Sequence, residues 1–228
     1  MSELWNGLLK AIELIVSFDP EVMEIAGRSL MISMTAAILA SLICIPLGSL
    51  IYFNRFPGKR ILINLIQTFF SIPTVVIGLF VFVLFSNAGP LGGLNLLFTP
   101  TVMVIGQMIL ITPVLLGLTI SAISGIDKTI MDTARSLGAS SFQMAIIVIK
   151  EARFAVIAAV IMGFGRAISE VGIALMVGGN IKGFTRVITT AISLETSKGE
   201  LELSLALGMI LIFIALIVNI LLNRLQQR

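Results

Sequence analysis

The sequence predicts an all-α protein, a polytopic bundle of membrane helices. Of its 228 residues, 57% are hydrophobic and 12% are charged, and the mean hydropathy is +1.10. Soluble domains carry about a quarter charged residues, so this composition excludes an ordinary soluble domain. Stretches long enough to cross a bilayer, with few or no charged residues, recur along the chain. They predict five transmembrane helices preceded by one amphipathic helix.

Residues 1–18 predict an amphipathic helix that lies in the membrane interface. Its apolar side chains recur at helical spacing: Leu4, Trp5, Leu8, Leu9, Ile12 and Ile15. Glu3, Lys10 and Glu13 stand between them, so the segment is too short and too charged to span comfortably. A signal peptide is the alternative, but the early acidic residue and the missing small-residue cleavage site argue against it. The helix either lies flat or crosses the membrane.

The remaining domain, 19–228, opens with Asp-Pro-Glu at 19–21, which is typical of a helix cap and an acidic first turn. Five charge-poor stretches predict the spans 29–54, 61–86, 100–124, 154–177 and 203–222. Segment 87–99 is rich in Gly, Pro and Asn and predicts the turn between the second and third spans. Pro73 and Pro113 are positions where these two spans are expected to break or kink.

Basic residues near the span ends decide the predicted orientation. One side of the membrane receives nine of them: Arg55, Lys59, Arg60, Lys128, Arg135, Lys150, Arg153, Arg224 and Arg228. The other side receives five: Lys10, Arg28, Lys182, Arg186 and Lys198. Lys and Arg concentrate in the cytoplasmic loops of membrane proteins. We therefore expect a multi-pass protein of the cell membrane, with segment 127–153 and the C-terminus in the cytoplasm and the N-terminus outside.

Residues 127–153 form a polar segment between the third and fourth spans. Asp127 suits the cap of a first short amphipathic helix, and Gly138 stands where a left-handed residue usually ends one. Ser140 followed by Gln143 is a capping-box pattern that begins a second helix. The sequence predicts two short helices joined at a glycine corner, which suits docking onto a protein outside the bilayer. The alternative is a cytoplasmic loop without a further role.

Two charged residues interrupt the fourth span. Arg166 and Glu170 are four apart and are therefore expected on one helical face. Charged side chains at membrane depth are costly and should face protein or water. One interpretation is a mutual ion pair that fixes helix packing. The other is a pair that lines or gates a solute path, in which Arg166 offers charge-assisted donors to an anion.

Gly178, Gly179 and Asn180 follow at the outer end of that span. Consecutive glycines allow backbone N–H groups to turn inward, which can form an anion-binding concavity or a hinge. An ordinary helix end is the alternative.

Composition limits the chemistry of the chain. Histidine is absent, which excludes imidazole proton relays and histidine-ligated haem. Cys44, the single cysteine, lies in an apolar run and is expected to pack. The sequence shows no nucleophile with a partnered base and no cluster of metal ligands. We therefore expect no catalytic residue, no cofactor and no metal ion. The net charge of +3 comes from scattered basic residues, so no nucleic-acid partner is expected.

The polar segment resembles the EAA loop of ABC importer permeases, the coupling helix that sits in a groove of the ATPase subunit. The residues that carry the likeness are Asp132, Thr133, Ala134, Gly138 and Val148. The resemblance implies an ATPase-coupling role for Asp132, Thr133, Ala134, Arg135, Gly138 and Ala139. Asp132 and Thr133 replace the usual Glu and Ala. Lys150 and Glu151 stand where Leu-Pro is usual, which changes where the second helix is expected to end.

Longer stretches are similar to tungstate-specific ABC permeases and, more loosely, to molybdate permeases. They are SIPTVVIGLFVFVLFSNAGPLG, LLFTPTVMVIGQMILITP, GRAISEVGIALMVGGNI and TRVITTAISLETSKGE. The resemblance implies a type I ABC importer permease fold and a homodimer in the lipid bilayer. It also implies two separate cytoplasmic ABC ATPase subunits and an extracytoplasmic tungstate-binding protein. ATP would close the ATPase pair, the loop would transmit that motion, and the path would alternate between inward and outward facing.

Three functions agree with these observations. The first is the permease of an ATP-driven importer for tungstate, or alternatively for molybdate or another oxyanion. The second is an ion-gradient-driven transporter or channel, which an inverted repeat would support. The third is a membrane anchor subunit of a larger enzyme complex, which the lack of histidine disfavours for haem-anchored versions. The chain contains no G-x-x-x-x-G-K-[ST] loop, so its energy must come from a partner or a gradient.

Overall fold

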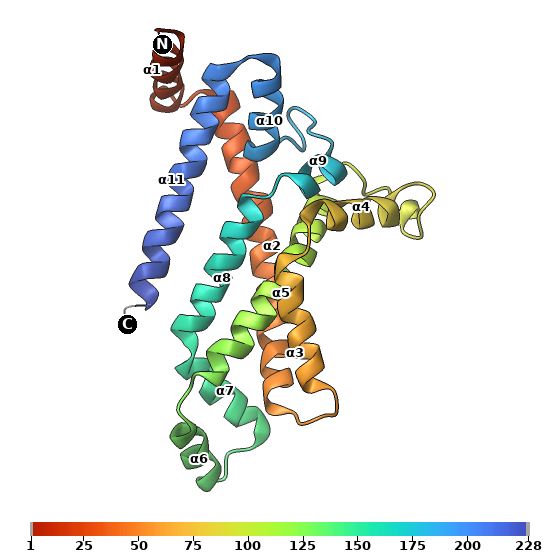
Figure 1. Cartoon of the computed structure of the whole chain (residues 1–228), viewed down its shortest axis with the longest axis vertical. Coiled ribbons are helices and arrows are strands. Elements are labelled where there is room, and N and C mark those ends of the chain that lie inside the picture. The colour runs from red at the N-terminus through yellow and green to blue at the C-terminus, as the bar shows by residue number, and fades with distance from the viewer. Residues whose placement is uncertain (1, 227–228) are drawn as a thin grey trace.

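The computed structural model describes residues 2–226, and within that range the chain is helical, with no strand. The elements in order are α1 (Ser2–Val16), α2 (Pro20–Phe53), α3 (Lys59–Thr68), η1 (Phe69–Ser71), α4 (Thr74–Phe85), η2 (Gly92–Leu94), α5 (Pro100–Ser124), α6 (Lys128–Ser136), α7 (Ser141–Glu151), α8 (Arg153–Ile168), α9 (Gly172–Gly178), α10 (Ile188–Lys198) and α11 (Leu201–Gln226). Figure 1 shows an elongated bundle with α6 and α7 at one end, α1 and α10 at the other, and α4 projecting to the side. We call α6, α7 and the corner between them the elbow.

The spans differ in detail from the predicted ones. Three helices are long and apolar enough to cross a membrane singly: Pro20–Phe53, Pro100–Ser124 and Leu201–Leu225. Two further spans are bent pairs, α3 and η1 with α4 at 99° and α8 with α9 at 60°. The predicted total of five is reached if each bent pair counts as one span.

Two predicted spans are therefore broken helices. The second turns at Pro73, as its proline suggested: Ile72 is extended, with ψ of 133°, because a residue before proline avoids the helical region. The fourth was predicted as continuous over 154–177, which is wrong, because α8 ends at Ile168 and α9 begins at Gly172.

The long helix α2 forms the axis of the bundle. The Asp19 carboxylate caps its start by accepting hydrogen bonds from the N–H groups of Glu21 and Val22, both at 3.0 Å. The predicted cap is thus confirmed: the helix begins at Pro20 and continues without a break through the predicted span 29–54 to Phe53. α2 packs along α5 and α8 through small residues. At Gly48 a Cβ would lie 3.0 Å from the Thr119 methyl group, so the two helices approach as closely as glycine allows.

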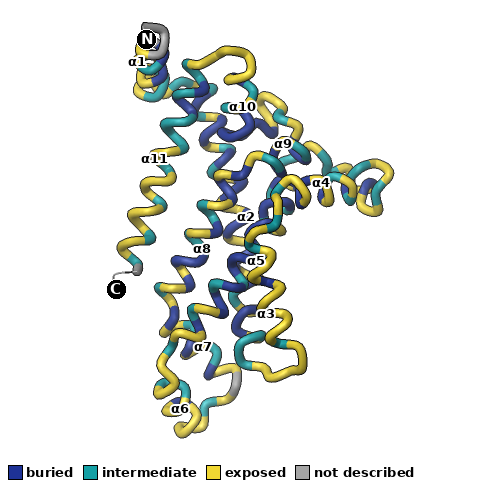
Figure 2. Tube along the Cα trace, in the orientation of Figure 1, coloured by how far each residue is buried: buried dark blue, intermediate teal, exposed yellow. Residues whose placement is uncertain are grey.

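Side chains form one central core and two smaller clusters. The central core joins α2, α4, α5, α8 and α9, and Figure 2 shows it as the dark-blue axis of the molecule. Large apolar residues remain exposed along α11, which is typical of a surface that faces lipid. One small cluster holds α10 and α11 against the start of α2, and the other fixes the elbow.

Charged residues fasten the end of the molecule opposite the elbow. Arg186 and Glu195 are 8% and 4% exposed, and their nearest charged atoms lie 3.3 Å apart. Glu21, on the first turn of α2, lies 3.7 Å from Arg186 and 2.7 Å from Lys182. Lys198 lies 3.0 Å from Glu195. These pairs tie α10 and the loop before it to α2.

Candidate functional site

The elbow begins and turns as its sequence predicts. The Asp127 carboxylate accepts hydrogen bonds from the N–H and the hydroxyl of Thr129, at 2.9 and 2.8 Å. These bonds favour the charged form and hold the pKa of Asp127 below its ordinary value. Ser140 and Gln143 form a complete capping box at the start of α7, with distances of 3.3 and 2.8 Å. Both predicted helix starts are confirmed.

Gly138 makes the corner between the two helices. Its φ of +80° lies in the left-handed region, which glycine adopts at least cost. The N–H of Ala139 reaches the carbonyl of Ala134, and the N–H of Gly138 reaches that of Arg135, both at 3.0 Å. This paired arrangement closes the end of α6.

A small apolar cluster fixes the elbow to the bundle. Ala134 from α6 and Met144 and Val148 from α7 are buried against Ile123 near the end of α5. Tyr52 and Phe53, at the end of α2, pack against the same cluster. The elbow is therefore attached to the ends of two long helices, α5 and α2.

The tip of the elbow carries apolar side chains that no other described residue covers. Leu137 is 83% exposed and Phe142 is 75% exposed. A shallow groove of about 380 Å³ runs beside them between the two helices, lined by Thr129, Ile130, Thr133, Ala134, Leu137, Ala139 and Ile147. Sequence reasoning selected neither Leu137 nor Phe142. In the sequence both are ordinary apolar residues, and only the fold shows that they are exposed.

The predicted elbow residues fall into two groups. Asp132, Thr133, Arg135 and Gly138 are exposed, so they are accessible to a partner. Ala134 is buried and Ala139 is half-buried, so these two shape the elbow from within.

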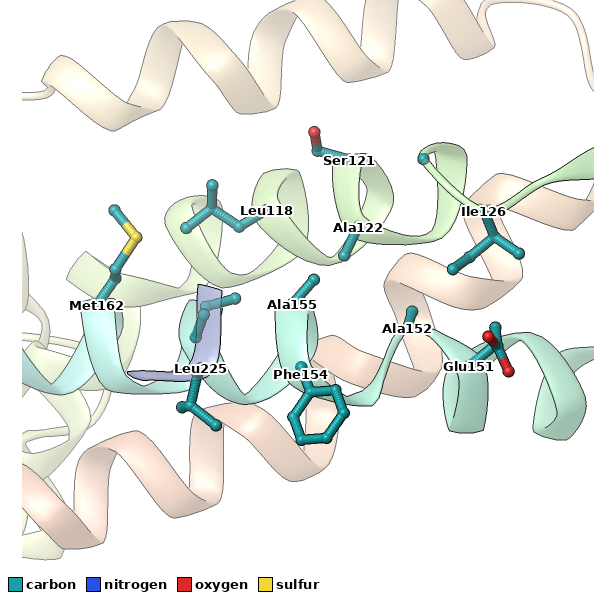
Figure 3. Close-up of a pocket in the computed structure, with 13 residues that line it drawn as sticks. Leu118, Ser121, Ala122, Ile126, Glu151, Ala152, Phe154, Ala155, Met162 and Leu225 are labelled. Carbon is teal, nitrogen blue, oxygen red and sulfur yellow. The ribbon is translucent and has the colours of Figure 1, made fainter. Parts of the chain in front are cut away.

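A cleft of about 520 Å³ separates α5 from α8 next to the elbow. Figure 3 shows Leu118, Ser121 and Ala122 of α5 on one wall, and on the other Ala155 of α8 and Ala152, which joins α7 to α8. Ser121, Ala122, Ala152 and Ala155 contribute small side chains to these walls. Among the residues that line the cleft, only Glu151 is charged.

The break between α8 and α9 is held by side chains from three elements. The Glu170 carboxylate accepts a hydrogen bond from the N–H of Ile173 at 3.1 Å. The Thr189 hydroxyl donates to the Glu170 carbonyl at 2.8 Å, and the Gln107 amide donates to the Ala167 carbonyl at 3.2 Å. Backbone groups freed by a broken helix must find partners at membrane depth, and these bonds supply them.

The predicted pairing of Arg166 with Glu170 is wrong. The helix ends between them, so they do not share a face. Glu170 is 7% exposed and Arg166 is exposed, and no ion pair joins the two, although both belong to the described residues. The i,i+4 rule failed because it assumes a continuous helix.

Residues 178–180 end α9. Gly179 has φ of +69°, and its N–H bonds to the carbonyl of Leu175 at 3.1 Å, so that N–H is already used within the chain. Asn180 donates from its side-chain amide to the carbonyl of Thr190 at 3.3 Å. A Cβ at Gly178 would lie 2.7 Å from the sulfur of Met103, so this glycine lets α9 approach α5. The segment has the geometry of a helix end, and within the described part of the chain no three His, Cys, Asp or Glu residues are placed to hold a metal ion.

The described chain is thus a bundle of membrane helices with two bent spans, an exposed elbow at one end and a helix break within the bundle. The model of the family described as "Binding-protein-dependent transport system inner membrane component" matches residues 44–228. The chain belongs to this family. It is thus a membrane transport subunit and not an enzyme.

Curated relatives are similar over nearly the whole chain. A tungstate uptake system permease protein, TupB, of Peptoclostridium acidaminophilum is 40% identical over 227 residues, covering 100% of both chains. The protein of that name from Campylobacter jejuni is 38% identical and covers 98% of this chain and 94% of its own. A probable anion ABC transporter permease protein of Haloferax volcanii is 40% identical over 91% of each chain.

Solved structures show the same fold at low sequence identity. The MetNI methionine ABC transporter in inward-facing conformations gives a TM-score of 0.67 at 15% identity, covering 90% of this chain and 94% of the other. A bacterial alginate ABC transporter gives 0.69 at 17% identity, covering 99% and 86%. The predicted type I ABC importer permease fold is confirmed.

Proposed function

We propose that this chain is the permease subunit of an ATP-driven importer for tungstate. It works as a homodimer with two cytoplasmic ABC ATPase subunits and receives tungstate from an extracytoplasmic binding protein. The full-length similarity to tungstate permeases supports the substrate. The observation that carries the coupling role is the bare apolar tip of the elbow, Leu137 and Phe142.

The setting of that tip favours a protein partner over lipid. Lys128, Asp132 and Arg135 are exposed on the same short helix as the corner, so the elbow stands in water. Exposed apolar area in water costs about 25 cal/mol per Å², and contiguous patches mark docking sites. A groove on an ATPase that takes Leu137 and Phe142 would remove this cost.

The elbow can transmit motion because it is continuous with two spans. α5 leads into it through Asp127, and Ala152 both ends α7 and precedes α8. The apolar cluster around Met144 fixes the elbow to the ends of α5 and α2, so the elbow can act as a lever on the bundle. The cleft between α5 and α8 beside the elbow leaves room for the lever to move.

The solute path is proposed to pass the break between α8 and α9. The residues assigned to the path or its gate are Arg166, Glu170, Gly178, Gly179 and Asn180. Arg166 is exposed and carries a guanidinium that can donate several hydrogen bonds to an oxyanion. Glu170 keeps the break in shape through its bond to the Ile173 N–H. Movement of α8 at the elbow would reach this break directly.

The orientation follows from the distribution of basic residues. The turn between α2 and α3 lies at the elbow end of the molecule (Figure 1); it holds Arg55, and Lys59 and Arg60 begin α3 directly after it. Positive charge favours the cytoplasm. The elbow and the C-terminus are therefore cytoplasmic, and α1 lies on the outer side of the cell membrane.

Molybdate or another oxyanion is the second candidate substrate. A molybdate/tungstate transport system permease protein, WtpB, of Thermococcus kodakarensis is 31% identical over 70% of this chain. Uptake of labelled tungstate by cells that express the whole transporter, with molybdate and sulfate as competitors, tests the choice. Competition by molybdate at equal concentration would contradict tungstate selectivity.

Co-purification tests the class of protein. The chain should bring down a P-loop ATPase and lose it when the elbow is altered. Uptake that persists without any ATPase, driven by an ion gradient, would overturn the proposal.

A further inference from the structure

An apolar stripe on α1 is left uncovered by the other residues that the structure describes. Trp5, Leu9, Ile12 and Val16 are spaced by four, three and four residues, so they lie along one side of the helix. Each of them is between 44% and 70% exposed. α1 therefore presents a continuous apolar surface at the end of the molecule opposite the elbow.

The other side of α1 is fixed to α11. Ala11 is fully buried, and a Cβ at Gly7 would lie 3.6 Å from Leu205. Lys10 forms an ion pair with Glu202 at 2.8 Å, and this pair raises the pKa of Lys10. The packing of α1 on α11 therefore fixes the direction in which the apolar stripe faces.

Phe18 extends the stripe at the cost of backbone strain. Its N–H bonds to the Ile15 carbonyl and the N–H of Asp19 bonds to that of Leu14, the same paired bonds that close α6 at Gly138. Phe18 has φ of +53° and is 73% exposed. Bulky residues disfavour this region, and such strain persists where the side chain serves a purpose.

Two other helices, α6 and α10, end with the same pair of backbone bonds. The end of α10 is closed by the same two bonds around Gly199, with φ of +85°. Glycine thus occupies this position at the ends of α6 and α10, and phenylalanine occupies it at the end of α1. The Phe18 side chain is exposed and contributes little to the fold, so we expect an apolar partner to contact it.

We propose that Trp5, Leu9, Ile12, Val16 and Phe18 are seated in the lipid of the outer leaflet, at the boundary between headgroups and acyl chains. The occupant is lipid because this surface continues one that faces lipid already. α1 flanks α11 (Figure 1), whose Ile212, Phe213, Leu216 and Ile217 are exposed along the span. Tryptophan is enriched at this depth, and exposed Lys10 and Glu13 supply the polar side that an interfacial helix keeps in water. The assignment to the outer leaflet depends on the proposed orientation of the chain, whereas the contact between α1 and lipid does not.

Trp5 is the only tryptophan in the chain, so its fluorescence reports on α1 alone. The full chain is reconstituted in phosphatidylcholine–phosphatidylglycerol vesicles with bromine at a shallow or a deep acyl position. We expect loss of Trp5 emission in brominated vesicles, greater for shallow bromine, and weak quenching by aqueous iodide.

Variants locate the contact on the stripe. Leu9→Glu with Ile12→Glu should reduce quenching by lipid and increase quenching by iodide. Glu13→Gln, on the polar side of α1, should leave both unchanged. Circular dichroism confirms that each variant retains its helices.

Three results would contradict the inference in different ways. Strong iodide quenching without bromolipid quenching places α1 in water and overturns it. Protection from both quenchers means that protein covers the stripe, which also overturns it. A third result is quenching by bromolipid together with iodide quenching from the cytoplasmic side alone. It would contradict the assignment to the outer leaflet and the proposed orientation, but it would support the contact between α1 and lipid.

Discussion

The hydroxyl of Thr189 donates a hydrogen bond of 2.8 Å to the carbonyl oxygen of Glu170. This bond joins the start of α10 to the break between α8 and α9. Glu170 in turn uses its carboxylate to bind the N–H of Ile173 at the start of α9. One buried residue thus connects three elements at the point where the fourth span bends.

Glu170→Gln should alter transport more than assembly. The amide oxygen of Gln can still accept from the Ile173 N–H, so the break keeps its shape, while the charge is lost. We expect tungstate uptake to fall at unchanged membrane content. Glu170→Ala leaves the N–H unpaired, at a cost of about 1–3 kcal/mol, and should lower the thermal unfolding midpoint in detergent. Normal uptake by the Gln variant would remove Glu170 from the path.

Gly138→Glu should leave the protein in the membrane but release the ATPase. The left-handed backbone costs a non-glycine residue roughly 1–2 kcal/mol. A Cβ there meets nothing within 4 Å, so the added charge points to the docking side. Co-purification of the ATPase measures the loss. Gly138→Asn is the control, since Asn tolerates this conformation; an ATPase retained by the Glu variant, with normal uptake, would exclude the docking role.

Phe142→Ala should weaken ATPase binding without destabilising the chain. The side chain is 75% exposed, so its removal leaves no cavity. Anchors at protein interfaces contribute about 2 kcal/mol or more, which is a loss of roughly 30-fold in affinity. Met144→Ala is the comparison, because Met144 is 4% exposed and its loss should lower the unfolding midpoint. Equal ATPase affinity of the Phe142 variant and the natural chain would refute the assignment of the tip.

The cap at Asp127 should make the start of α6 sensitive to acid. Its pKa is lower in the folded chain than its ordinary value of 3.8, so it stabilises the fold above that pH. The stabilisation is lost as the pH falls through the folded value. Hydrogen-exchange protection of segment 127–138, compared at pH 6 and pH 3, measures this. Asp127→Asn also caps but does not titrate, so it should remove the pH dependence; an equal loss in both proteins would contradict the cap.

Phe18→Gly should raise the thermal unfolding midpoint in detergent. Glycine relieves the left-handed backbone, which costs a larger residue about 1–2 kcal/mol. Gly199→Ala places a side chain in the matching position at the end of α10 and should lower the midpoint. A lower midpoint for Phe18→Gly would show that the Phe18 side chain supports the fold itself.

Local features were predictable where the deciding interactions are local. The caps at Asp19 and Asp127, the capping box of Ser140 with Gln143 and the turn at Gly138 use bonds between residues at most five apart. The membrane class likewise follows from composition alone. The break at Pro73 follows from the missing N–H of proline.

Distant contacts could not be predicted from spacing. Nothing local to Arg166 and Glu170 shows that the helix ends between them; the break depends on Thr189 from α10 and Gln107 from α5. Leu137 and Phe142 appear as ordinary apolar residues until the fold leaves them bare.

The sequence by itself determined that this is a helical membrane protein, where its helices begin, and where its elbow turns, because hydropathy and capping bonds act over a few residues. The tertiary structure decided the bends of 99° and 60°, the partners of Glu170 and the surfaces of the elbow and α1 that stay uncovered. These depend on which helices meet, and that is set by packing between residues far apart in the chain.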